Sequence, residues 1–485
     1  MAVCFFEVIM VFSNLFFIFV FFAACVTVYF LMPKIWLKNA VLIIFSLIFY
    51  AWGEPTYIVL LLLSTLVNYI AGLVIDKHRN KPMAKAAVTI AVIFNIALLF
   101  VFKYTDFFIE NINFVCHVSI PLPHIRLPIG ISFFTFQIMS YIIDCYWEKV
   151  DVQKNFFKLL LYISLFPQLI AGPIVRYSTI EKEISDRKST FEDISEGATR
   201  FIVGMSKKVV LANGLNEVVK ALLGSYDDTS FIGQTLVNQS FVGTLTGVIC
   251  FALYVYFDFS GYSDMAIGMG RIFGFHFDEN FKHPFVSRNI TEFWQRWHIS
   301  LGTFFRDYLL YLPIFGKRRK YLNLFLVWFC TGFWHGAAWN FILWGLYFGF
   351  FVFIETLIGK KRMKKIPAAI SHIYSLLVIT IGFGIFYFEN FRDLTNFFKN
   401  LFFINGNAFI DPISKSTLLN SIFLIVLAAI LSMPILPKLK KWFYSTEKRK
   451  KTAVCITAVT NVLLLCLCFV LLTDTTNNPF LYFRF

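Results

Sequence analysis

Apolar stretches separated by short polar loops run along most of the 485 residues. Most of these stretches are long enough to cross a bilayer as a helix of ~20 residues, and they lack the alternation typical of barrel strands. Backbone groups find no water in hydrocarbon, so spanning segments satisfy those groups internally as helices. The pattern therefore predicts an all-α polytopic membrane protein surrounded by membrane lipids. A content of 58% hydrophobic and 19% aromatic residues, with a mean hydropathy of +0.69, excludes an ordinary soluble core.

Basic residues gather in the short loops between the apolar stretches. The formal net charge of +15 would suggest a nucleic-acid partner in a soluble domain, but here it follows the positive-inside rule, so we expect no nucleic acid. The loops that we place in the cytoplasm carry Lys34 and Lys38 and the runs 77–85, 317–320, 360–365 and 438–451. Counting crossings between these loops predicts about eleven spans in the plasma membrane, with both termini extracytoplasmic.

Two kinds of interruption refine this topology. Residues 53–55 (GEP) divide the apolar stretch 40–75 into two spans. Segment 127–177 contains Pro, Gly and polar residues, and segment 241–264 contains Gly and polar residues. We expect parts of both to re-enter the membrane without crossing it.

No low-complexity tract or Gly/Pro-rich linker divides the chain. We therefore expect one membrane domain, residues 1–472, followed by an extracytoplasmic tail, residues 473–485. Because residues 1–12 hold no Lys or Arg, the first apolar stretch is interpreted as a retained span and not as a signal peptide.

His335 lies in an apolar stretch, residues 321–353, that carries no Asp, Glu, Lys or Arg. An ionisable side chain inside a membrane is costly, so His335 is a functional candidate. The alternative is a structural histidine that forms hydrogen bonds inside the helix bundle. Metal binding is not expected, because His276 and His283 lack a zinc-site spacing with Cys or carboxylate partners.

A second polar segment, residues 289–300 (NITEFWQRWHIS), interrupts the centre of the chain. Asn289 or Thr291 is a candidate cap for a helix that begins near Glu292. On that helix Trp294 and His298 would lie one turn apart on the same face. The sequence thus predicts a wall formed by a His and a Trp, with Arg296 pointing elsewhere.

Several motifs in order resemble one family over nearly the whole chain. They are residues 127–137 (LPIGISFFTFQ), 166–174 (FPQLIAGPI), 257–264 (FDFSGYSD), 293–301 (FWQRWHISL), 306–308 (RDY) and 332–336 (GFWHG). With these motifs the chain resembles the membrane-bound O-acyltransferases, specifically the branch of alginate O-acetyltransferase subunit I. The resemblance implies a ring of tilted helices around a central tunnel that joins a cytoplasmic funnel to an outer opening.

The resemblance also assigns roles to residues. His298 matches the invariant histidine of the family's first motif and His335 that of its second, and in the family an acyl group passes from a cytoplasmic thioester to a hydroxyl outside. Two departures are visible: residues 306–316 are one residue longer than the common pattern, and Phe348 stands where a histidine is common. A histidine at position 348 is therefore not needed for the reaction in this protein.

The chemistry of the residues agrees with an acyl transfer. A neutral imidazole can take the proton of an attacking hydroxyl, and burial favours the neutral form. His298 could instead shape the funnel wall without transferring protons. Trp294 and Trp334 are interpreted as packing or tunnel lining. Arg296 and Arg306 could attract the phosphates of acetyl-CoA, the expected acyl donor, although basic residues also set orientation, and Arg306 could simply pair with Asp307.

The last residues, 477–485 (NNPFLYFRF), hold four aromatic side chains on the predicted outer side. They resemble a terminal motif of the same branch, and also that of the small partner peptide in the related teichoic-acid D-alanylation system, in which a tyrosine hydroxyl is thought to carry the acyl group. We therefore hypothesise that Tyr482 accepts the acetyl group near His335. Interfacial anchoring by aromatic residues is the alternative.

The sequence thus leads to a hypothesis: a membrane O-acyltransferase that moves acetyl from cytoplasmic acetyl-CoA toward an extracytoplasmic polysaccharide. No cofactor is expected to remain bound. Because the chain has no soluble serine-transferase domain, an exported SGNH-type acetyltransferase is the expected partner. The alternatives are D-alanyl transfer to teichoic acid and, from a different class, a polysaccharide exporter or flippase.

Overall fold

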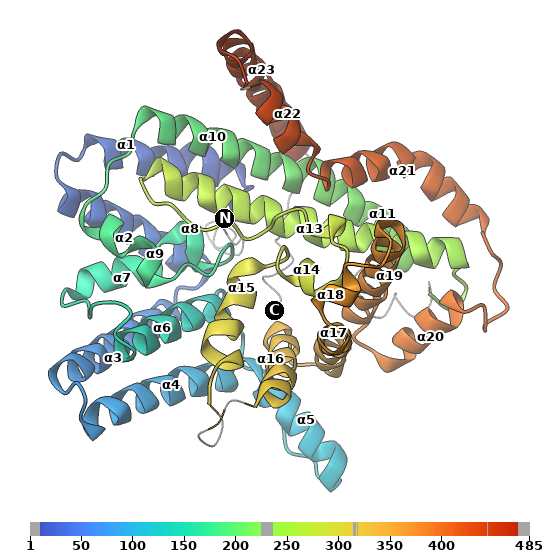
Figure 1. Cartoon of the computed structure of the whole chain (residues 1–485). Coiled ribbons are helices and arrows are strands. Elements are labelled where there is room, and N and C mark those ends of the chain that lie inside the picture. The colour runs from blue at the N-terminus through green and yellow to red at the C-terminus, as the bar shows by residue number, and fades with distance from the viewer. Residues whose placement is uncertain (1–9, 225–235, 314–316, 318, 444, 474–485) are drawn as a thin grey trace, which may run out of the picture. The chain divides into compact units, whose positions relative to one another are not determined.

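The computed structural model describes residues 10–224, 236–313, 317, 319–443 and 445–473. Every element of this part is a helix, so the predicted all-α class is confirmed (Figure 1). The described residues form two compact units. One holds residues 10–205, 262–279 and 469–473, and the other holds the described residues of 206–261 and 280–468. The expected single domain that ends at residue 472 stays a prediction.

The helices of the first unit are mostly long and apolar. In chain order they are η1 (Phe17–Phe22), α1 (Ala23–Leu31), α2 (Ile35–Gly53), α3 (Ile58–Lys77), α4 (Pro82–Lys103), α5 (Thr105–Cys116), α6 (Ile131–Tyr146), α7 (Phe156–Ser164), α8 (Phe166–Leu169), α9 (Tyr177–Ser185) and α10 (Phe191–Ser206). The end of α2 and the start of α3 confirm that residues 53–55 separate two helices.

Polar side chains join α3 to α4 inside the first unit. Asn95 Nδ2 donates to Asn68 Oδ1 at 2.9 Å, and Asn68 Nδ2 donates back to Asn95 Oδ1 at 3.2 Å. Both side chains are fully buried. Hydrogen bonds between side-chain amides stabilise the contact of two membrane helices, because hydrocarbon cannot solvate the amide groups.

The second unit carries both candidate histidines. Its helices are η2 (Lys207–Ala212), α11 (Asn213–Leu223), most of α13 (Phe241–Ile272), η3 (Pro284–Val286), α14 (Ile290–Trp294), α15 (Ile299–Phe305), η4 (Arg306–Leu310), α16 (Lys320–His335), α17 (Trp339–Ile358), α18 (Lys360–Met363), α19 (Ala368–Tyr387), α20 (Phe391–Leu401), α21 (Pro412–Leu431), α22 (Ile435–Phe443) and most of α23 (Glu447–Thr473).

Within the described residues, eight helices are long and apolar enough to cross a membrane: α2, α3, α4, α13, α17, α19, α21 and residues 449–473 of α23. The polytopic membrane fold is therefore confirmed. Segment 127–177 is broken into shorter helices, as expected. The interruption expected in residues 241–264 was wrong, because α13 runs unbroken for 32 residues. Of its most apolar segment, 72% is buried inside the protein, so its polar residues lie away from lipid.

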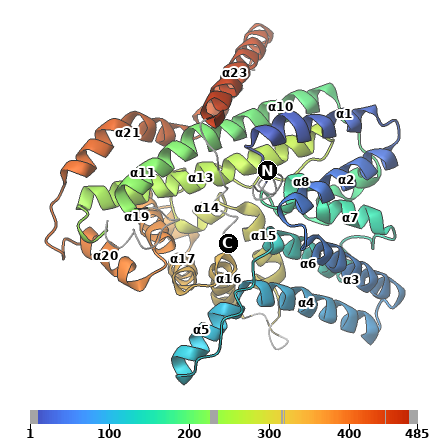
Figure 2. The same cartoon turned by 180° about the vertical axis from the view of Figure 1, so that it is seen from behind.

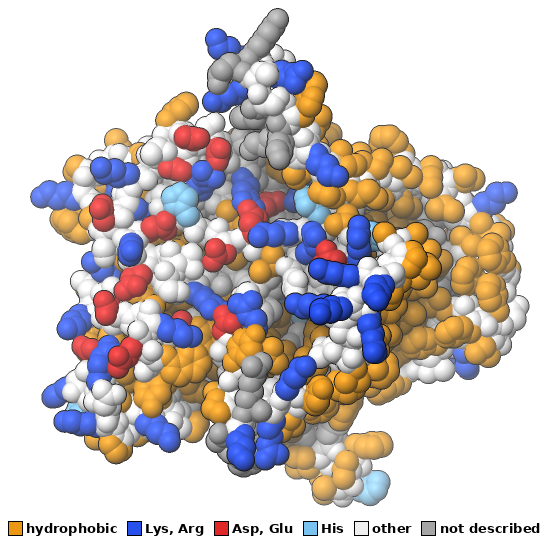
Figure 3. All heavy atoms as spheres, viewed as in Figure 1, with side chains coloured by type: hydrophobic (Ala, Val, Ile, Leu, Met, Phe, Trp, Pro, Cys, Tyr) orange, Lys and Arg blue, Asp and Glu red, His pale blue; other side chains and the backbone are white. Residues whose placement is uncertain are grey.

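The periphery of the second unit presents apolar side chains outward. Only 11% of the most apolar segment of α21 is buried. Its side chains Ile413, Leu419 and Phe423 are 66%, 64% and 79% exposed. Figure 3 shows hydrophobic side chains covering the face over α20 and α21. A helix that is apolar on its exposed side suits contact with lipid.

Candidate active site

His335 is the last residue of α16, and three residues connect it to α17. The two helices lie side by side in both views (Figures 1 and 2). They approach this closely because glycines face one another: a Cβ atom on Gly345 would lie 2.9 Å from Gly332 Cα and would collide with the Trp328 carbonyl oxygen. Small residues at such a contact let two membrane helices pack backbone to backbone. The close contact holds His335 against α17.

Aromatic rings enclose the His335 imidazole, which is 1% exposed. The ring centroids of Trp344, Trp334 and Phe386 lie 4.8, 5.0 and 5.6 Å from that of His335, each with a nearly perpendicular ring. The prediction of a buried histidine in an apolar setting is confirmed. Its enclosure keeps bulk water away from the imidazole.

Asn340 orients one of these rings through the backbone. Its side chain is 1% exposed, and its Nδ2 donates to the Phe386 carbonyl oxygen at 3.0 Å and to that of Ile385 at 3.5 Å. These carbonyls lie in the last turn of α19, where intrahelical donors run out. The amide thus fixes the end of α19, and with it Phe386, beside His335.

His298 lies in a turn between α14 and α15 and has the left-handed backbone conformation, with φ 44°. Asn289 caps α14 as predicted, because its side chain accepts from Glu292 N at 2.8 Å. The predicted continuous helix through His298 was wrong, since α14 ends at Trp294. Trp294 and His298 therefore do not share a helix face.

Asn280 holds the His298 ring through its side-chain oxygen. Asn280 Oδ1 lies 3.2 Å from His298 Nδ1 and accepts from Ser300 N at 3.2 Å and Ser300 Oγ at 2.9 Å. The Ser300 backbone N–H can only donate, so the Asn280 side-chain atom that it contacts is the amide oxygen. An amide oxygen can only accept, so the His298 Nδ1 atom beside it carries a proton. The neutral imidazole then keeps its lone pair on Nε2.

His298 itself is 1% exposed and lies outside the eight candidate spans. Burial lowers the pKa of His298, because desolvation disfavours the charged ring. A neutral imidazole can accept a proton, which is the state that a base requires.

One indole separates the two imidazoles. The Trp334 ring centroid lies 5.8 Å from that of His298 and 5.0 Å from that of His335. The wall predicted from a His and a Trp therefore contains Trp334 beside His298, in place of Trp294. The Trp294 ring centroid lies 5.4 Å from that of Trp344, which in turn packs against His335.

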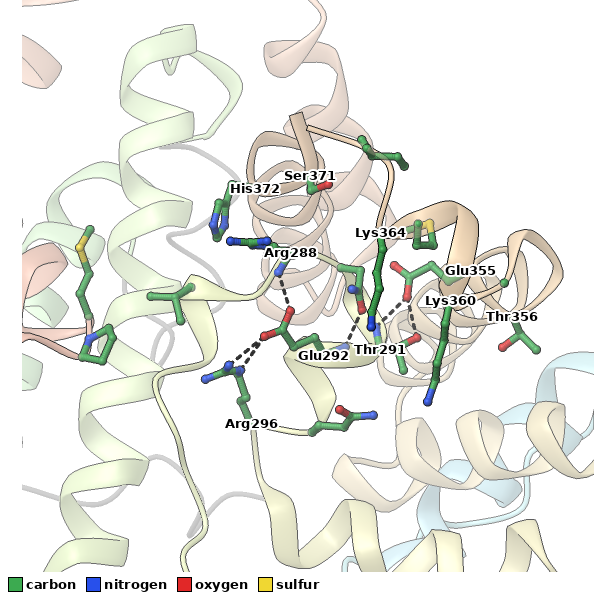
Figure 4. A pocket seen from close by; sticks show the side chains of 18 of the residues that line it. Arg288, Thr291, Glu292, Arg296, Glu355, Thr356, Lys360, Lys364, Ser371 and His372 are labelled. Carbon is green, nitrogen blue, oxygen red and sulfur yellow. Dashed lines mark hydrogen bonds and ion pairs between the residues drawn. The ribbon is translucent and has the colours of Figure 1, made fainter. Parts of the chain in front are cut away.

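The charged candidates form local pairs. Arg296 Nη2 lies 2.8 Å from Glu292 Oε1, and Arg306 Nε donates to Asp307 Oδ1 at 2.7 Å. The pair of Arg306 with Asp307 confirms one of the alternatives predicted for these residues. Of the candidates Trp294, Arg296, Arg306, Asp307 and Trp334, only Arg296 lines the cavity of about 950 Å³ shown in Figure 4, and neither His298 nor His335 lines it.

Two further predictions concern a metal and the tail. Among the described residues, no group of three or more His, Cys, Asp or Glu side chains is arranged to hold a metal ion. Tyr482 lies outside the described residues, so its acyl-carrier role stays a prediction.

Several residues at the site were not predicted from the sequence. Trp344 and Asn280 contact the histidines only after the chain folds back, and no local pattern marks them. Lys208 and Asp258 form a buried ion pair at 2.5 Å, with side chains 4% and 1% exposed. Phe259, the neighbour of Asp258, packs edge-on against His298 at 4.7 Å. An ionisable residue in the apolar motif 257–264 was the available signal for this pair.

Comparisons with known proteins agree with this geometry. Residues 148–391 match the profile of the membrane-bound O-acyltransferase family, MBOAT. The chain is 36% identical to a Pseudomonas putida protein named "Probable alginate O-acetylase AlgI", over 81% of this chain and 80% of that one. It is 31% identical to a Helicobacter pylori protein named "Peptidoglycan O-acetyltransferase", over 94% and 92% of the two chains.

A more distant relative carries a different name. A Bacillus subtilis protein named "Teichoic acid D-alanyltransferase" is 29% identical over 54% of this chain and 68% of its own length. Its match covers much less of the chain than the two O-acetylating relatives.

Proposed function

This chain belongs to the membrane-bound O-acyltransferase family and is a multi-pass membrane O-acyltransferase, and on that premise we propose that it moves acetyl from cytoplasmic acetyl-CoA to an extracytoplasmic polysaccharide. The names of the alginate- and peptidoglycan-acetylating relatives support the acceptor class. The basic loops support the cytoplasmic side for the donor and the outer side for both termini. The single observation that carries the chemistry is the pair of buried imidazoles on either side of Trp334.

The proposed step is one acyl transfer. The acceptor hydroxyl oxygen attacks the thioester carbonyl carbon while His335 takes the hydroxyl proton. The C–S bond then breaks, and the proton passes from the imidazolium to the departing sulfur, which leaves as the thiol of coenzyme A. The aromatic enclosure excludes water, so hydrolysis of the thioester does not compete. His298 is the second candidate base, with its lone pair on Nε2.

The indole N–H groups of two tryptophans are candidate hydrogen-bond donors to the oxyanion of the tetrahedral intermediate. The Nε1 atoms of Trp294 and Trp344 are buried and form no hydrogen bond with any described residue. Trp344 also touches the His335 ring. A buried N–H directed at developing negative charge stabilises it strongly in a dry site. We assign this role first to Trp344.

Tyr482 and the exported partner complete the proposal. Acetyl would pass from the thioester to the Tyr482 hydroxyl and from there to an exported SGNH-type transferase that modifies the polysaccharide. The terminal motif supports this relay. Mass spectrometry of the C-terminal peptide during turnover tests it: we expect acetyl on Tyr482, and full activity of Tyr482→Phe without any acetylated peptide would overturn the relay.

One experiment separates the proposal from its alternatives. Inside-out vesicles that contain the protein and enclose a polysaccharide acceptor are given radiolabelled acetyl-CoA from outside, and label is followed on the protein and on the enclosed acceptor. Label transfer that His335→Ala abolishes supports the enzyme. Transfer of D-alanine without acetyl transfer would favour the teichoic acid alternative that the Bacillus relative suggests. Movement of polysaccharide that His335→Ala leaves unchanged would favour an exporter.

A further inference from the structure

A cavity of about 950 Å³ opens in the second unit, and neither His298 nor His335 lines it. Its wall is formed by α14, the ends of α17 and α18, the start of α19 and the residues that begin α22 (Figure 4). Basic side chains dominate its charged lining, which consists of Arg288, Arg296, Lys360, Lys364, Lys438, Glu292 and Glu355. The basic loop 360–365 places this opening on the side that we propose to be cytoplasmic.

The two carboxylates of the cavity already serve the structure. Glu355, 6% exposed, accepts from the backbone N–H groups of Ile290 and Thr291 at 2.7 and 2.8 Å and from Thr291 Oγ1 at 2.6 Å. It therefore ties the first turn of α14 to α17, where free N–H groups need acceptors. Glu292 Oε1 is paired with Arg296 at 2.8 Å, and its Oε2 accepts from Arg288 N at 3.0 Å.

Four cations of the lining remain without such a partner. Among the described residues, no carboxylate forms an ion pair with Arg288, Lys360, Lys364 or Lys438. Figure 3 shows Lys and Arg side chains gathered over α18 on this face. After the pairing of Glu292 with Arg296 and the burial of Glu355 against α14, the cavity keeps an excess of positive charge, which raises its encounter rate with anions.

We propose that this cavity is a phosphate-binding site, with Arg288, Lys360, Lys364 and Lys438 as the binding cations. Guanidinium and ammonium groups are the side chains that bind phosphate best. Two ligands could supply the phosphate, and the experiment below distinguishes them.

The first source is coenzyme A, and this choice rests on the proposed function. α17 connects the cavity to the site, because Thr356 lines the cavity and Trp344, twelve residues earlier, touches His335. At 1.5 Å per residue the two lie ~18 Å apart along the helix. Phosphates held at the cavity would leave the pantetheine arm to extend along α17 toward the imidazole.

The second source is an anionic phospholipid headgroup. α22 begins at the rim of the cavity and presents Leu436, Leu439 and Trp442, which are 53%, 47% and 52% exposed. A short basic helix with exposed apolar side chains suits the membrane interface, and basic pockets between helices on the cytoplasmic side bind lipid phosphates.

The test compares two double variants of one short loop in the full-length protein. Lys360→Gln/Lys364→Gln removes two lining cations, whereas Lys361→Gln/Lys365→Gln removes the same charge beside the cavity, since neither residue lines it. Affinity for unacylated coenzyme A is measured in nanodiscs of zwitterionic lipid, and affinity for phosphatidylglycerol in detergent. We expect Lys360→Gln/Lys364→Gln to weaken the binding of coenzyme A or of phosphatidylglycerol about tenfold at low salt. In Lys361→Gln/Lys365→Gln both affinities should stay within about twofold of the wild-type values.

Each result decides the question. Loss of coenzyme A affinity assigns the site to the donor, and loss confined to phosphatidylglycerol assigns it to lipid. Equal effects of both variants, or no effect on either probe, would overturn the phosphate site. The His335→Ala protein should bind coenzyme A with unchanged affinity, so a failed acetyl transfer leaves the binding result interpretable on its own.

Discussion

The two histidines are buried equally but are held in place in different ways. His335 ends α16, and its surroundings are rings and glycine contacts between α16, α17 and α19. His298 lies in a turn, and its ring is fixed by the Asn280 side chain. Packing thus positions one imidazole, and a hydrogen-bonded loop positions the other.

This difference has a chemical consequence. Aromatic packing sets the orientation of the His335 ring, whereas a ring whose Nδ1 lies against an amide oxygen also has one defined tautomer. In the proposed step His335 contacts the reacting hydroxyl. His298 suits a defined acceptor role at Nε2 or the alignment of Trp334, which touches both rings.

Removal of the His335 imidazole should have the largest effect. We expect His335→Ala to lower kcat for acetyl transfer by about 10²–10⁴-fold, the usual contribution of a general base. Transfer from radiolabelled acetyl-CoA by the reconstituted protein measures this, with thermal unfolding as a control for folding. If His298→Ala proves more damaging than His335→Ala at equal stability, the roles assigned to the two rings are reversed.

Trp344→Phe keeps a ring beside His335 and removes only its N–H donor. We expect kcat to fall about 10²-fold while KM changes little, because the lost interaction belongs to the transition state. Trp328→Phe is the matched control, since Trp328 lies in the same aromatic cluster through Trp294 but does not touch His335. Equal activity of Trp344→Phe and wild type would remove Trp344 from the proposed mechanism.

Gly345→Ala tests whether helix packing positions His335. The added methyl group would collide with the Trp328 carbonyl, so we expect a loss of about 1–3 kcal/mol in the free energy of unfolding together with reduced activity. Gly302→Ala is the control, because its nearest neighbour, Trp294 O, lies at an ordinary 3.6 Å. Thermal unfolding in detergent compares the two variants. Similar stability of both would show that α16 and α17 tolerate separation.

The smallest effect is expected from loosening His298. Asn280→Ala removes the acceptor of His298 Nδ1 and Ser300 N, and we expect about a tenfold loss of kcat. Asn280→Asp keeps an acceptor oxygen at this position and should recover most of the rate. Steady-state kinetics of the two variants measure the effect. An inactive Asn280→Asp protein with an active Asn280→Ala protein would contradict a clamp based on this oxygen.

The sequence alone determined the class of the protein and much of its local structure. Apolar length, turn residues and capping residues are properties of neighbouring positions. They predicted the helical spans, the break between α2 and α3, the Asn289 cap and the burial of His335. The motifs around His298 and His335 also led to the correct family.

Only the tertiary structure decided how the site is assembled. The helix expected through His298 stops at Trp294, while Glu355, more than sixty residues away, satisfies the first N–H groups of α14. Trp344, Asn280 and Asn340 acquire their roles through contacts made when distant segments meet. Local propensity acts over a few residues, whereas burial and hydrogen bonding between distant segments select the turn at His298 and the rings around His335.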